Sequence, residues 1–387
     1  MIESAHRVNL RPLPFRAPLS DYQRQAEELH DGHRAKAPDV LALIHRCHPR
    51  FLDERIPWLP KDVLDSEIAA ARFDLADART TVARHHSFTD WPALEEWVAA
   101  LQLGGGVTRF ESAVEAAIDG DLPALESALR HDPDLVSARS TRRTCLDPPV
   151  HQATILHYVA ANGVESHRQR TPRNAVAVAR TLLERGAIAD ALAGFYGCEC
   201  ATLSLLVSSS PPAEAGLQVE LAELLLDHGA AIEGHGESWG TPLLSALLFG
   251  FPRAADALVR RGAHVGVAAA AGLGLAEDLG RMIPGSDSRE RHLGLALAAQ
   301  LGHAETVRIL LDSGEDPDRF NPEGSHAHAT PLHHAALHGH LDVVKLLVER
   351  GARLDIADRI YKGTPLGWAR HEGQHEVEAF LRSRGAP

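Results

Sequence analysis

Six short motifs that contain a glycine punctuate the chain after residue 180. Each directly follows an apolar stretch of helical periodicity, such as "LAELLL" or "VVKLLV". Glycine adopts the left-handed backbone conformation without a Cβ clash, so a glycine just past an apolar periodic segment indicates a helix C-terminus. A helix end that recurs in this way indicates a repeat protein. The motifs are "ERGA" at Glu184, "DHGA" at Asp227, "RRGA" at Arg260, "DSGE" at Asp312, "ERGA" at Glu349 and "SRGA" at Ser383.

A second marker begins with threonine and leads four of the units. Threonine can cap the free amides of a helix, and proline is preorganised for the first helical position. Each unit is therefore predicted to be a short helix, a glycine turn, a second helix and a loop. The markers are "TILHYVAANG" from Thr154, "TPLLSALLFG" from Thr241, "TPLHHAALHG" from Thr330 and "TPLGWARHEG" from Thr364.

These units resemble the ankyrin repeat, whose marker is T-P-L-H-x-A at a period of about 33 residues. The segment "TPLHHAALHGHLDVVKLLVERGARLDIAD" matches that pattern nearly throughout. The resemblance covers residues 108–387 with varying quality, and it implies an ankyrin-repeat solenoid with finger loops. We expect about eight units, which begin near Arg109, Thr154, Ala201, Thr241, Val265, Arg291, Thr330 and Thr364.

Three units carry insertions, and the first unit lacks the Thr-Pro marker, as is typical of a terminal repeat with one polar face. Insertions in repeat arrays fall in loops, often on the binding face. The inserts are "ESHRQRTPRN" in the second unit, "SSSPPAEAG" in the third and "RFNPEGSHAHA" before the seventh.

Residues 1–105 do not repeat, and their apolar spacing predicts four helices. The segments are "LSDYQRQAEELHDGH", "APDVLALIHRCHPRFL", "DSEIAAARFDLADARTTVARHHSF" and "TDWPALEEWVAAL", and "GGG" at 104–106 is predicted to be a linker. The phrase "ADARTTVARHHSFTDWPALEEWV" resembles the helical leader of many bacterial ankyrin-repeat proteins, which implies a bacterial source. We predict an all-α chain with a small helical bundle at 1–105, able to cover the first repeat, and a repeat array at 106–387.

The resemblance implies which side chains line the concave groove. These are the residue after the motif histidine and the two residues before the glycine. An apolar strip that includes Leu248, Phe249 and Leu297 is expected there, either to receive a partner or to be covered by the N-terminal module. Glu115, Asp119, Tyr158 and Asn162 form a lesser candidate site at the other end. The predicted groove residues are Glu115, Asp119, Tyr158, Asn162, Ser245, Phe249, Leu273, Leu297, Leu301, His334, His338, Trp368 and His371.

The segment around Thr330 is rich in histidine, and the repeat divides this set in two. The resemblance implies structural roles for His333 and His340, as for His157 and His303. Four histidines are left over: His326, His328, His334 and His338. His334 and His338 share one helical face at i, i+4, a spacing that can place two imidazoles on one metal ion.

With His371 and Glu372 one repeat further on, these histidines could hold zinc or act as general acid and base groups. The alternative is a polar binding surface that happens to contain several histidines. His334, His338, His371 and Glu372 are the catalytic candidates.

A second candidate zinc site joins two adjacent fingers. Cys198 and Cys200 form a C-x-C pair, and Cys145 and His151 lie on the preceding finger. Thiolates and imidazoles in a set of four are typical structural zinc ligands. The alternative is that these are ordinary small residues in loops.

Composition narrows the functional classes. The net charge of −13, with no Lys/Arg-rich run, disfavours nucleic acid and an anionic membrane as partners. The N-terminus lacks the apolar core of a secretory signal, and four cysteines indicate a reducing cytoplasm. Nucleophile and phosphate-binding motifs are absent from the sequence.

We therefore predict a monomeric binding scaffold for a protein partner. The alternatives are an enzyme or small-molecule binder that uses the His/Trp/Glu-rich end of the groove, with or without metal, and a scaffold stabilised by zinc.

Overall fold

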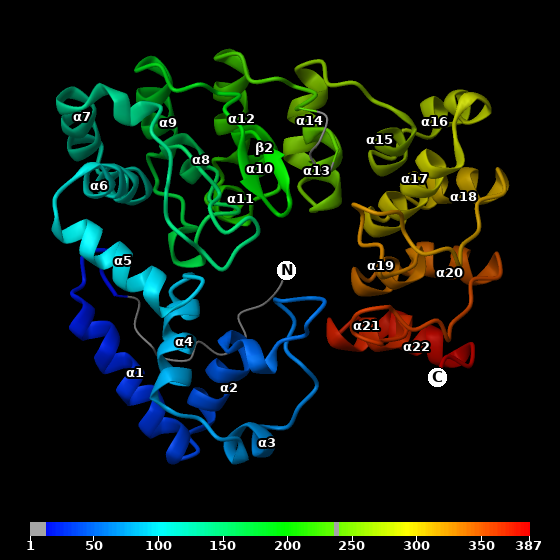
Figure 1. Ribbon diagram of the computed structural model, residues 1–387. Helices are drawn as coiled ribbons and strands as arrows, with labels where there is room; N and C mark the ends of the chain where they lie inside the picture. The colour runs from blue at the N-terminus through cyan, green and yellow to red at the C-terminus, as the bar shows by residue number, and fades with distance from the viewer. Residues whose placement is uncertain (1–12, 236–239) are drawn as a thin grey trace. The chain divides into compact units, whose positions relative to one another are not determined.

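The computed structural model describes residues 13–235 and 240–387 (Figure 1). The chain divides into two compact units: unit 1 is Met1–Leu206 with Ser210–Leu217, and unit 2 is Val207–Ser209 with Gln218–Pro387. Residues 1–12, where the sequence predicts no secretory signal, lie outside the described residues. None of the described helices combines the length and apolar character needed to cross a lipid bilayer.

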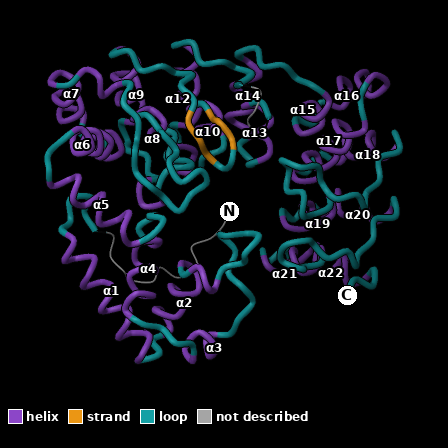
Figure 2. Tube along the Cα trace, viewed as in Figure 1, coloured by secondary structure: helices purple, strands orange, loops and turns teal. Residues whose placement is uncertain are grey.

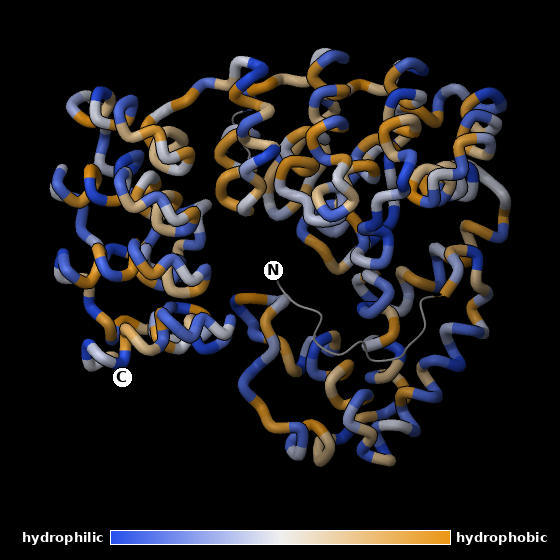
Figure 3. Tube along the Cα trace, turned by 180° about the vertical axis from the view of Figure 1, so that it is seen from behind, coloured by the Kyte–Doolittle hydropathy of each residue, from blue (hydrophilic) through white to orange (hydrophobic). Residues whose placement is uncertain are grey.

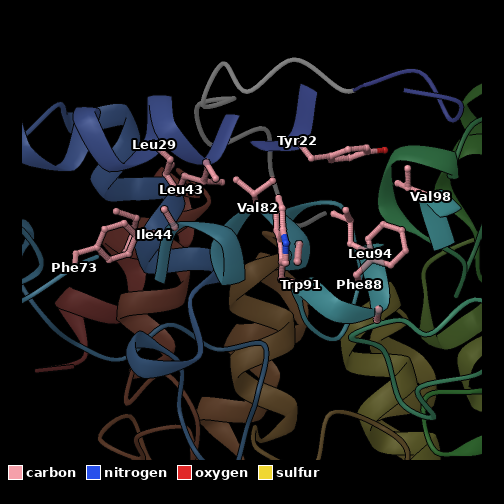
Figure 4. Close-up of a cluster of buried hydrophobic side chains, with 14 of the residues drawn as sticks. Tyr22, Leu29, Leu43, Ile44, Phe73, Val82, Phe88, Trp91, Leu94 and Val98 are labelled. Carbon is pink, nitrogen blue, oxygen red and sulfur yellow. The ribbon is translucent and has the colours of Figure 1, made fainter. Parts of the chain in front are cut away.

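The leader of unit 1 is a bundle of short helices around an apolar core. Its elements are α1 (Leu19–Arg34), α2 (Pro38–Cys47), the 3-10 turn η1 (Pro49–Phe51), α3 (Asp65–Ala70), α4 (Leu75–His85) and α5 (Trp91–Gln102). Apolar side chains at helical spacing on these elements meet in one buried cluster (Figure 4). It includes Tyr22, Leu29, Leu43, Ile44, Phe73, Val82, Phe88, Trp91, Leu94 and Val98.

The prediction of one helix over residues 65–88 is wrong, because the chain breaks between α3 and α4. The Asp74 carboxylate accepts hydrogen bonds from the backbone N–H groups of Ala76 (2.9 Å) and Asp77 (3.1 Å), which starts a new helix. Phe73, in the break, is buried in the leader core. A local cap and one buried aromatic ring therefore outweigh the continuous helical periodicity.

The first repeat follows the leader without a flexible linker. Gly106 already begins α6 (Gly106–Asp119), and the Thr108 hydroxyl donates a hydrogen bond to the Leu101 carbonyl at the end of α5 (2.9 Å). Val107 packs against the leader core. Gly104 and Gly105 thus form a short turn between α5 and α6 rather than a long linker, and α5 contacts α6 within unit 1. The domain boundary at residue 105 stays a prediction.

The rest of unit 1 holds two helix pairs, a hairpin and the start of a third pair. The elements are α7 (Leu122–His131), η2 (Pro133–Val136), α8 (Ile155–Val159), η3 (Ser166–Arg168), α9 (Ala175–Glu184), β1 (Ala193–Phe195), β2 (Cys198–Cys200), α10 (Thr202–Val207) and α11 (Ser210–Glu214). β1 and β2 pair antiparallel in the register Ala193 with Cys200 (Figure 2). α11 lies in the insert of the third unit.

Unit 2 is built from helix pairs that contact one another in chain order (Figure 1). Its elements are α12 (Gln218–Asp227), α13 (Pro242–Leu248), α14 (Pro252–Arg260), α15 (Val267–Gly272), α16 (Ala276–Met282), η4 (Ile283–Gly285), α17 (Ser288–Leu301), α18 (Ala304–Asp312), α19 (Pro331–Leu337), α20 (Leu341–Glu349), α21 (Pro365–His371) and α22 (His375–Ser383).

The core of unit 2 runs between its helices and is rich in alanine, leucine and valine, which lets neighbouring helices pack closely. Hydrophobic and hydrophilic segments alternate along the helix pairs (Figure 3). The first helices contact one another in the order α13, α15, α17, α19 and α21, and the second helices α16, α18, α20 and α22 do the same. The described residues thus contain the eight predicted pairs, and the all-α repeat fold with a leading helical bundle is confirmed.

Both local signals of the repeat have their expected geometry. The six motif glycines have φ between +85° and +99°, the left-handed region that favours glycine. The Thr330 hydroxyl lies 2.8 Å from Nδ1 of His333, and the pair forms a reciprocal cap at the start of α19. Thr154 and His157 repeat this arrangement at α8.

Candidate functional site

Four histidines and one tryptophan gather in unit 2 at the start of the seventh and eighth repeats. His334 lies on α19, and His338 directly follows that helix. The finger before α19, residues 321–329, carries His326 and His328, and α21 carries Trp368. We call His326, His328, His334 and His338 the His cluster.

His334 lies at the centre of the His cluster. Its ring centroid is 4.9 Å from that of His326, 6.4 Å from that of His338 and 5.5 Å from that of Trp368, which meets it edge-on. The ring centroid of His328 lies 6.0 Å from that of His326 and 5.8 Å from that of Trp368. The structure therefore brings the four predicted histidines together, with the predicted Trp368 against them.

The imidazole of His334 is buried and has no hydrogen-bond partner. The side chain is 4% exposed, and neither Nδ1 nor Nε2 is paired with any described group. Burial lowers the pKa of His334 well below its usual value, and the neighbouring imidazoles lower it further. His334 is therefore neutral near pH 7 and holds one unused N–H donor and one unused ring-nitrogen acceptor.

The preceding residue shows what a structural histidine does in this fold. Nδ1 of His333 accepts from the backbone N–H of Thr330 (3.2 Å), and Nε2 lies 3.2 Å from the Gly363 carbonyl. Likewise, Nε2 of His340 lies 2.9 Å from the Gln300 carbonyl. The structural roles expected for His333 and His340 are confirmed.

Asp358 positions the tryptophan beside the His cluster, and the sequence reasoning missed it. Its buried carboxylate accepts from the indole N–H of Trp368 (3.1 Å) and from the backbone N–H groups of Ile360, Tyr361 and Gly363 (2.6–2.9 Å). An Asp followed five residues later by glycine, in "DRIYKG", is a turn signal that could have revealed it. Because four donors occupy this carboxylate, it is not free to pair with a ligand.

The two remaining catalytic candidates lie at the exposed end of α21. His371 and Glu372 are both exposed. Burial lowers the pKa of His338, and the nearby Glu372 carboxylate partly opposes this effect. His334 by contrast is buried, so the four candidates do not share one environment.

The predicted apolar strip is only partly open. Phe249 is 38% exposed, and Leu273 and Leu301 are half-buried. Leu297 is 1% exposed because it packs against the α15 backbone at Gly272, and Leu248 and Ser245 are also buried. The strip is therefore smaller than the sequence suggested.

In unit 1 the acidic end of the predicted groove is already occupied by arginines of the chain itself. Glu115 lies 2.9 Å from Nε of Arg168 and 3.2 Å from Nη2 of Arg170. Asp119 lies 2.6 Å from Nη2 of Arg170. Both arginines come from the "ESHRQRTPRN" insert, which folds back onto α6.

Arg168 belongs to a buried cluster of charges that the sequence reasoning missed. Its guanidinium lies 2.6 Å from Glu111 and 3.7 Å from Glu165, and Nε of Arg142 lies 3.4 Å from Glu165. Burial alone would raise the pKa of Glu165, but Arg142 and Arg168 outweigh it and hold that pKa well below its usual value. We call Glu111, Arg142, Glu165 and Arg168 the charge cluster.

Two predicted groove residues of unit 1 also belong to its interior. Tyr158 is fully buried, with the Arg168 guanidinium 5.6 Å from its ring centroid. The Asn162 side chain accepts from the Tyr196 hydroxyl (2.7 Å) and donates to the Leu205 carbonyl (3.2 Å). The insert and the hairpin cover these positions, which a simple repeat would leave open.

The four residues of the second zinc candidate have other neighbours. Cys145 lies against the leader, with Sγ 3.9 Å from the Arg84 carbonyl. His151 stacks on Phe195 and lies 3.8 Å from Glu165, and Cys198 and Cys200 lie two apart on β2. Among residues 13–235 and 240–387, no three His, Cys, Asp or Glu side chains are placed to hold one metal ion. Neither zinc set finds support in these residues.

Comparison with known proteins identifies the repeats. The family model for ankyrin repeats (three copies) matches residues 267–358 and 295–386. The chain is 33% identical over 103 residues to ankyrin repeat and SAM domain-containing protein 6 of Mus musculus, which is 27% of this chain and 11% of that protein. It is 39% identical over 74 residues to cyclin-dependent kinase inhibitor 2A of Monodelphis domestica, which is 19% of this chain and 41% of that protein.

A third similarity is to serine/threonine-protein kinase VIK of Arabidopsis thaliana, at 42% identity over 79 residues, or 20% of this chain and 17% of that protein. The chain thus spans less than half the length of each of these relatives. With the helix pairs and capped turns described above, these matches show that residues 267–386 are ankyrin repeats within an all-α repeat fold.

Proposed function

We propose that this chain is a scaffold that binds a protein partner through one face of unit 2. That face consists of the C-terminal ends of the first helices α13, α15, α17, α19 and α21, with the finger 321–329. Repeat proteins commonly bind partners along such a row. Of the relatives, cyclin-dependent kinase inhibitor 2A is named for an action on another protein.

The observation that carries the proposal is a row of exposed or half-buried apolar and imidazole side chains on consecutive first helices. Phe249, Leu273, Leu301, His338 and His371 are exposed or half-buried and occupy the positions where the repeat leaves the residue type free. The first helices that carry these side chains contact one another in chain order within unit 2. Protein interfaces combine such apolar and aromatic groups with a polar rim.

Unit 1 supports the same choice of face. There the equivalent acidic positions on α6 are paired with Arg168 and Arg170 of the insert. A partner would have to displace a fully buried arginine from three carboxylates to reach them. Leu273, Leu301, His338 and His371 of unit 2 are exposed or half-buried instead.

The test is affinity capture from cells of the source organism, followed by direct binding of the recovered partner to variants. We expect Phe249→Ala/His338→Ala to weaken binding at least tenfold. The matched control, His375→Ala, changes an exposed histidine on the second helix α22 and should leave binding unchanged. A partner that is insensitive to the double variant would contradict the proposed face.

The catalytic or small-ligand alternative stays a prediction. It would need His334 and His338 to act with His371 and Glu372, yet His334 is buried and the last two are exposed. Stoichiometric zinc in protein purified without a His tag, lost in His334→Ala/His338→Ala, would favour it. Bacterial origin, a cytoplasmic location and a monomeric state also stay predictions.

A further inference from the structure

His334 is the least satisfied histidine of the face described above. Its immediate neighbour His333 and the nearby His340 each pair with backbone groups, whereas both ring nitrogens of His334 are buried and have no partner among the described residues. A buried polar group without a partner costs roughly 1–3 kcal/mol. Such a group in a native protein therefore calls for an explanation, such as a role in binding.

The surroundings of His334 define the kind of group that could pair with it. Among the described residues, the groups that face His334 are imidazoles and an aromatic ring. A cation would be repelled if the imidazoles took up protons, and an anion would require His334 to be charged in a dry, aromatic environment. The facing groups are His326 and His328 of the finger, His333 and His338 of the α19 segment, and Trp368 of α21.

A neutral imidazole offers one donor and one acceptor. A carboxamide or a hydroxyl group offers the same two functions in complementary form. Metal is not favoured, because the described residues bring no three ligands together.

The ring of His326 lies against that of His334. His326 has a positive φ of 53°, a backbone region that costs a non-glycine residue about 1 kcal/mol or more. Its ring is half-buried and lies 4.9 Å from that of His334. Non-glycine residues held in this way cluster at ligand clamps.

We propose that His334 is the polar anchor of the binding face, and that it receives an uncharged carboxamide or hydroxyl side chain of a protein partner when the His326 ring turns aside. This inference rests on the proposed scaffold function. The partner group would supply both hydrogen bonds that His334 lacks. The rings of Trp368, His328 and His338 would then exclude water from them.

The experiment selects peptides from a phage-displayed random library on the immobilised full chain at pH 7.5. We expect the selected peptides to share an Asn, Gln, Ser or Thr anchor. His334→Phe should weaken them about 10- to 100-fold, and His334→Gln, which keeps a donor and an acceptor, should restore part of the affinity. The matched control His375→Ala, an exposed histidine on the second helix α22, should bind like the wild type. Circular dichroism checks that each variant is folded.

A double-mutant cycle separates a direct contact from an indirect effect. Replacing the anchor of a selected peptide by leucine should weaken binding to the wild type but add little to the loss in His334→Phe.

Each contrary result has its own meaning. Peptides whose affinity does not change in His334→Phe would contradict the role of His334 as the anchor, while the proposed scaffold function would still hold. Peptides rich in Asp and Glu, whose affinity rises as the pH falls to 6, point to an anion site and overturn the uncharged partner. Peptide binding that requires added zinc chloride would contradict the uncharged partner group and favour a metal site. A library that yields no binders counts against both the scaffold and the anchor.

Discussion

At the scale of single residues, adjacent histidines of the same helix have opposite roles. His333 and His334 differ by one position on α19, so they point in different directions from the helix. His333 reaches Thr330 and Gly363 and completes a cap. His334 reaches only aromatic rings. The role of each follows from its neighbours and not from its residue type.

This contrast predicts opposite effects of one substitution. His333→Phe should lower the free energy of unfolding by about 1–3 kcal/mol, because it removes paired hydrogen bonds. His334→Phe should raise it by about 1 kcal/mol, because an unpaired polar ring is replaced by an apolar one among aromatic neighbours. Urea unfolding followed by circular dichroism measures both. An equal loss in the two variants would mean that His334 has a structural partner.

At the level of secondary-structure elements, the insert of the second repeat folds back onto α6 and is not an open binding finger. We call this insert, "ESHRQRTPRN", the strap. Its η3 turn carries Arg168 to α6, where Glu111 and Glu115 lie one helical turn apart. Arg142, on the preceding loop, stacks 4.0 Å from the Phe88 ring of the leader and donates to the His86 carbonyl (2.6 Å). The strap and this loop thus join the leader to the first two repeats of unit 1.

The buried ion pairs predict that removing the positive charge of Arg168 has a large effect on the stability of unit 1. Arg168→Met should destabilise unit 1 by about 3–5 kcal/mol, because Glu111 and Glu165 would be left as buried, uncompensated charges. Arg170→Ala, in a half-exposed pair, is the control and should cost less than about 1 kcal/mol. Thermal unfolding compares them, and Arg168→Met/Glu111→Gln should recover part of the loss. Equal stability of the two single variants would contradict a buried ionic role.

The glycine turn that ends each repeat gives a second prediction for elements. Gly351 has φ +92° with open space around the position of a Cβ, so Gly351→Ala should destabilise by about 1 kcal/mol through backbone strain alone. Gly280 lies inside α16, also in open space but without a positive φ, so Gly280→Ala should stabilise by about 0.5–1 kcal/mol. Melting temperatures should move in opposite directions.

At the level of the whole molecule, the burial of histidines makes stability depend on pH in mild acid. Burial lowers the pKa of His326 to about 4, with His328 adding to the effect, and burial also lowers the pKa of His334 well below its usual value. In the unfolded chain both groups titrate near 6.5. As the pH falls from 6.5 towards 4, the unfolded chain therefore binds protons that the folded chain does not, and stability is lost.

We accordingly expect the finger and α19 to open in mild acid. Hydrogen exchange of residues 326–338, monitored by mass spectrometry, should speed up between pH 7 and pH 5 after correction for the intrinsic rate. His326→Phe/His334→Phe should reduce this change, whereas His375→Phe, at an exposed position of α22, should not. A pH response that is the same in all three proteins would place its origin outside the His cluster. Among the described residues, the other titratable or aromatic groups that face these two rings are His328, His333, His338 and Trp368.

Local sequence patterns were enough to predict the helix pairs, the glycine turns and the threonine caps, and the resemblance to ankyrin repeats added the structural roles of His333 and His340. These features depend on contacts within one repeat or between adjacent repeats, so local periodicity and capping chemistry suffice to predict them. Only the tertiary structure decided that Arg168 fills the acidic positions of α6, that Leu297 is covered, and that His334 is left without a partner. Whether a buried polar group is satisfied depends on where inserted loops place their atoms, and no sequence period encodes that placement.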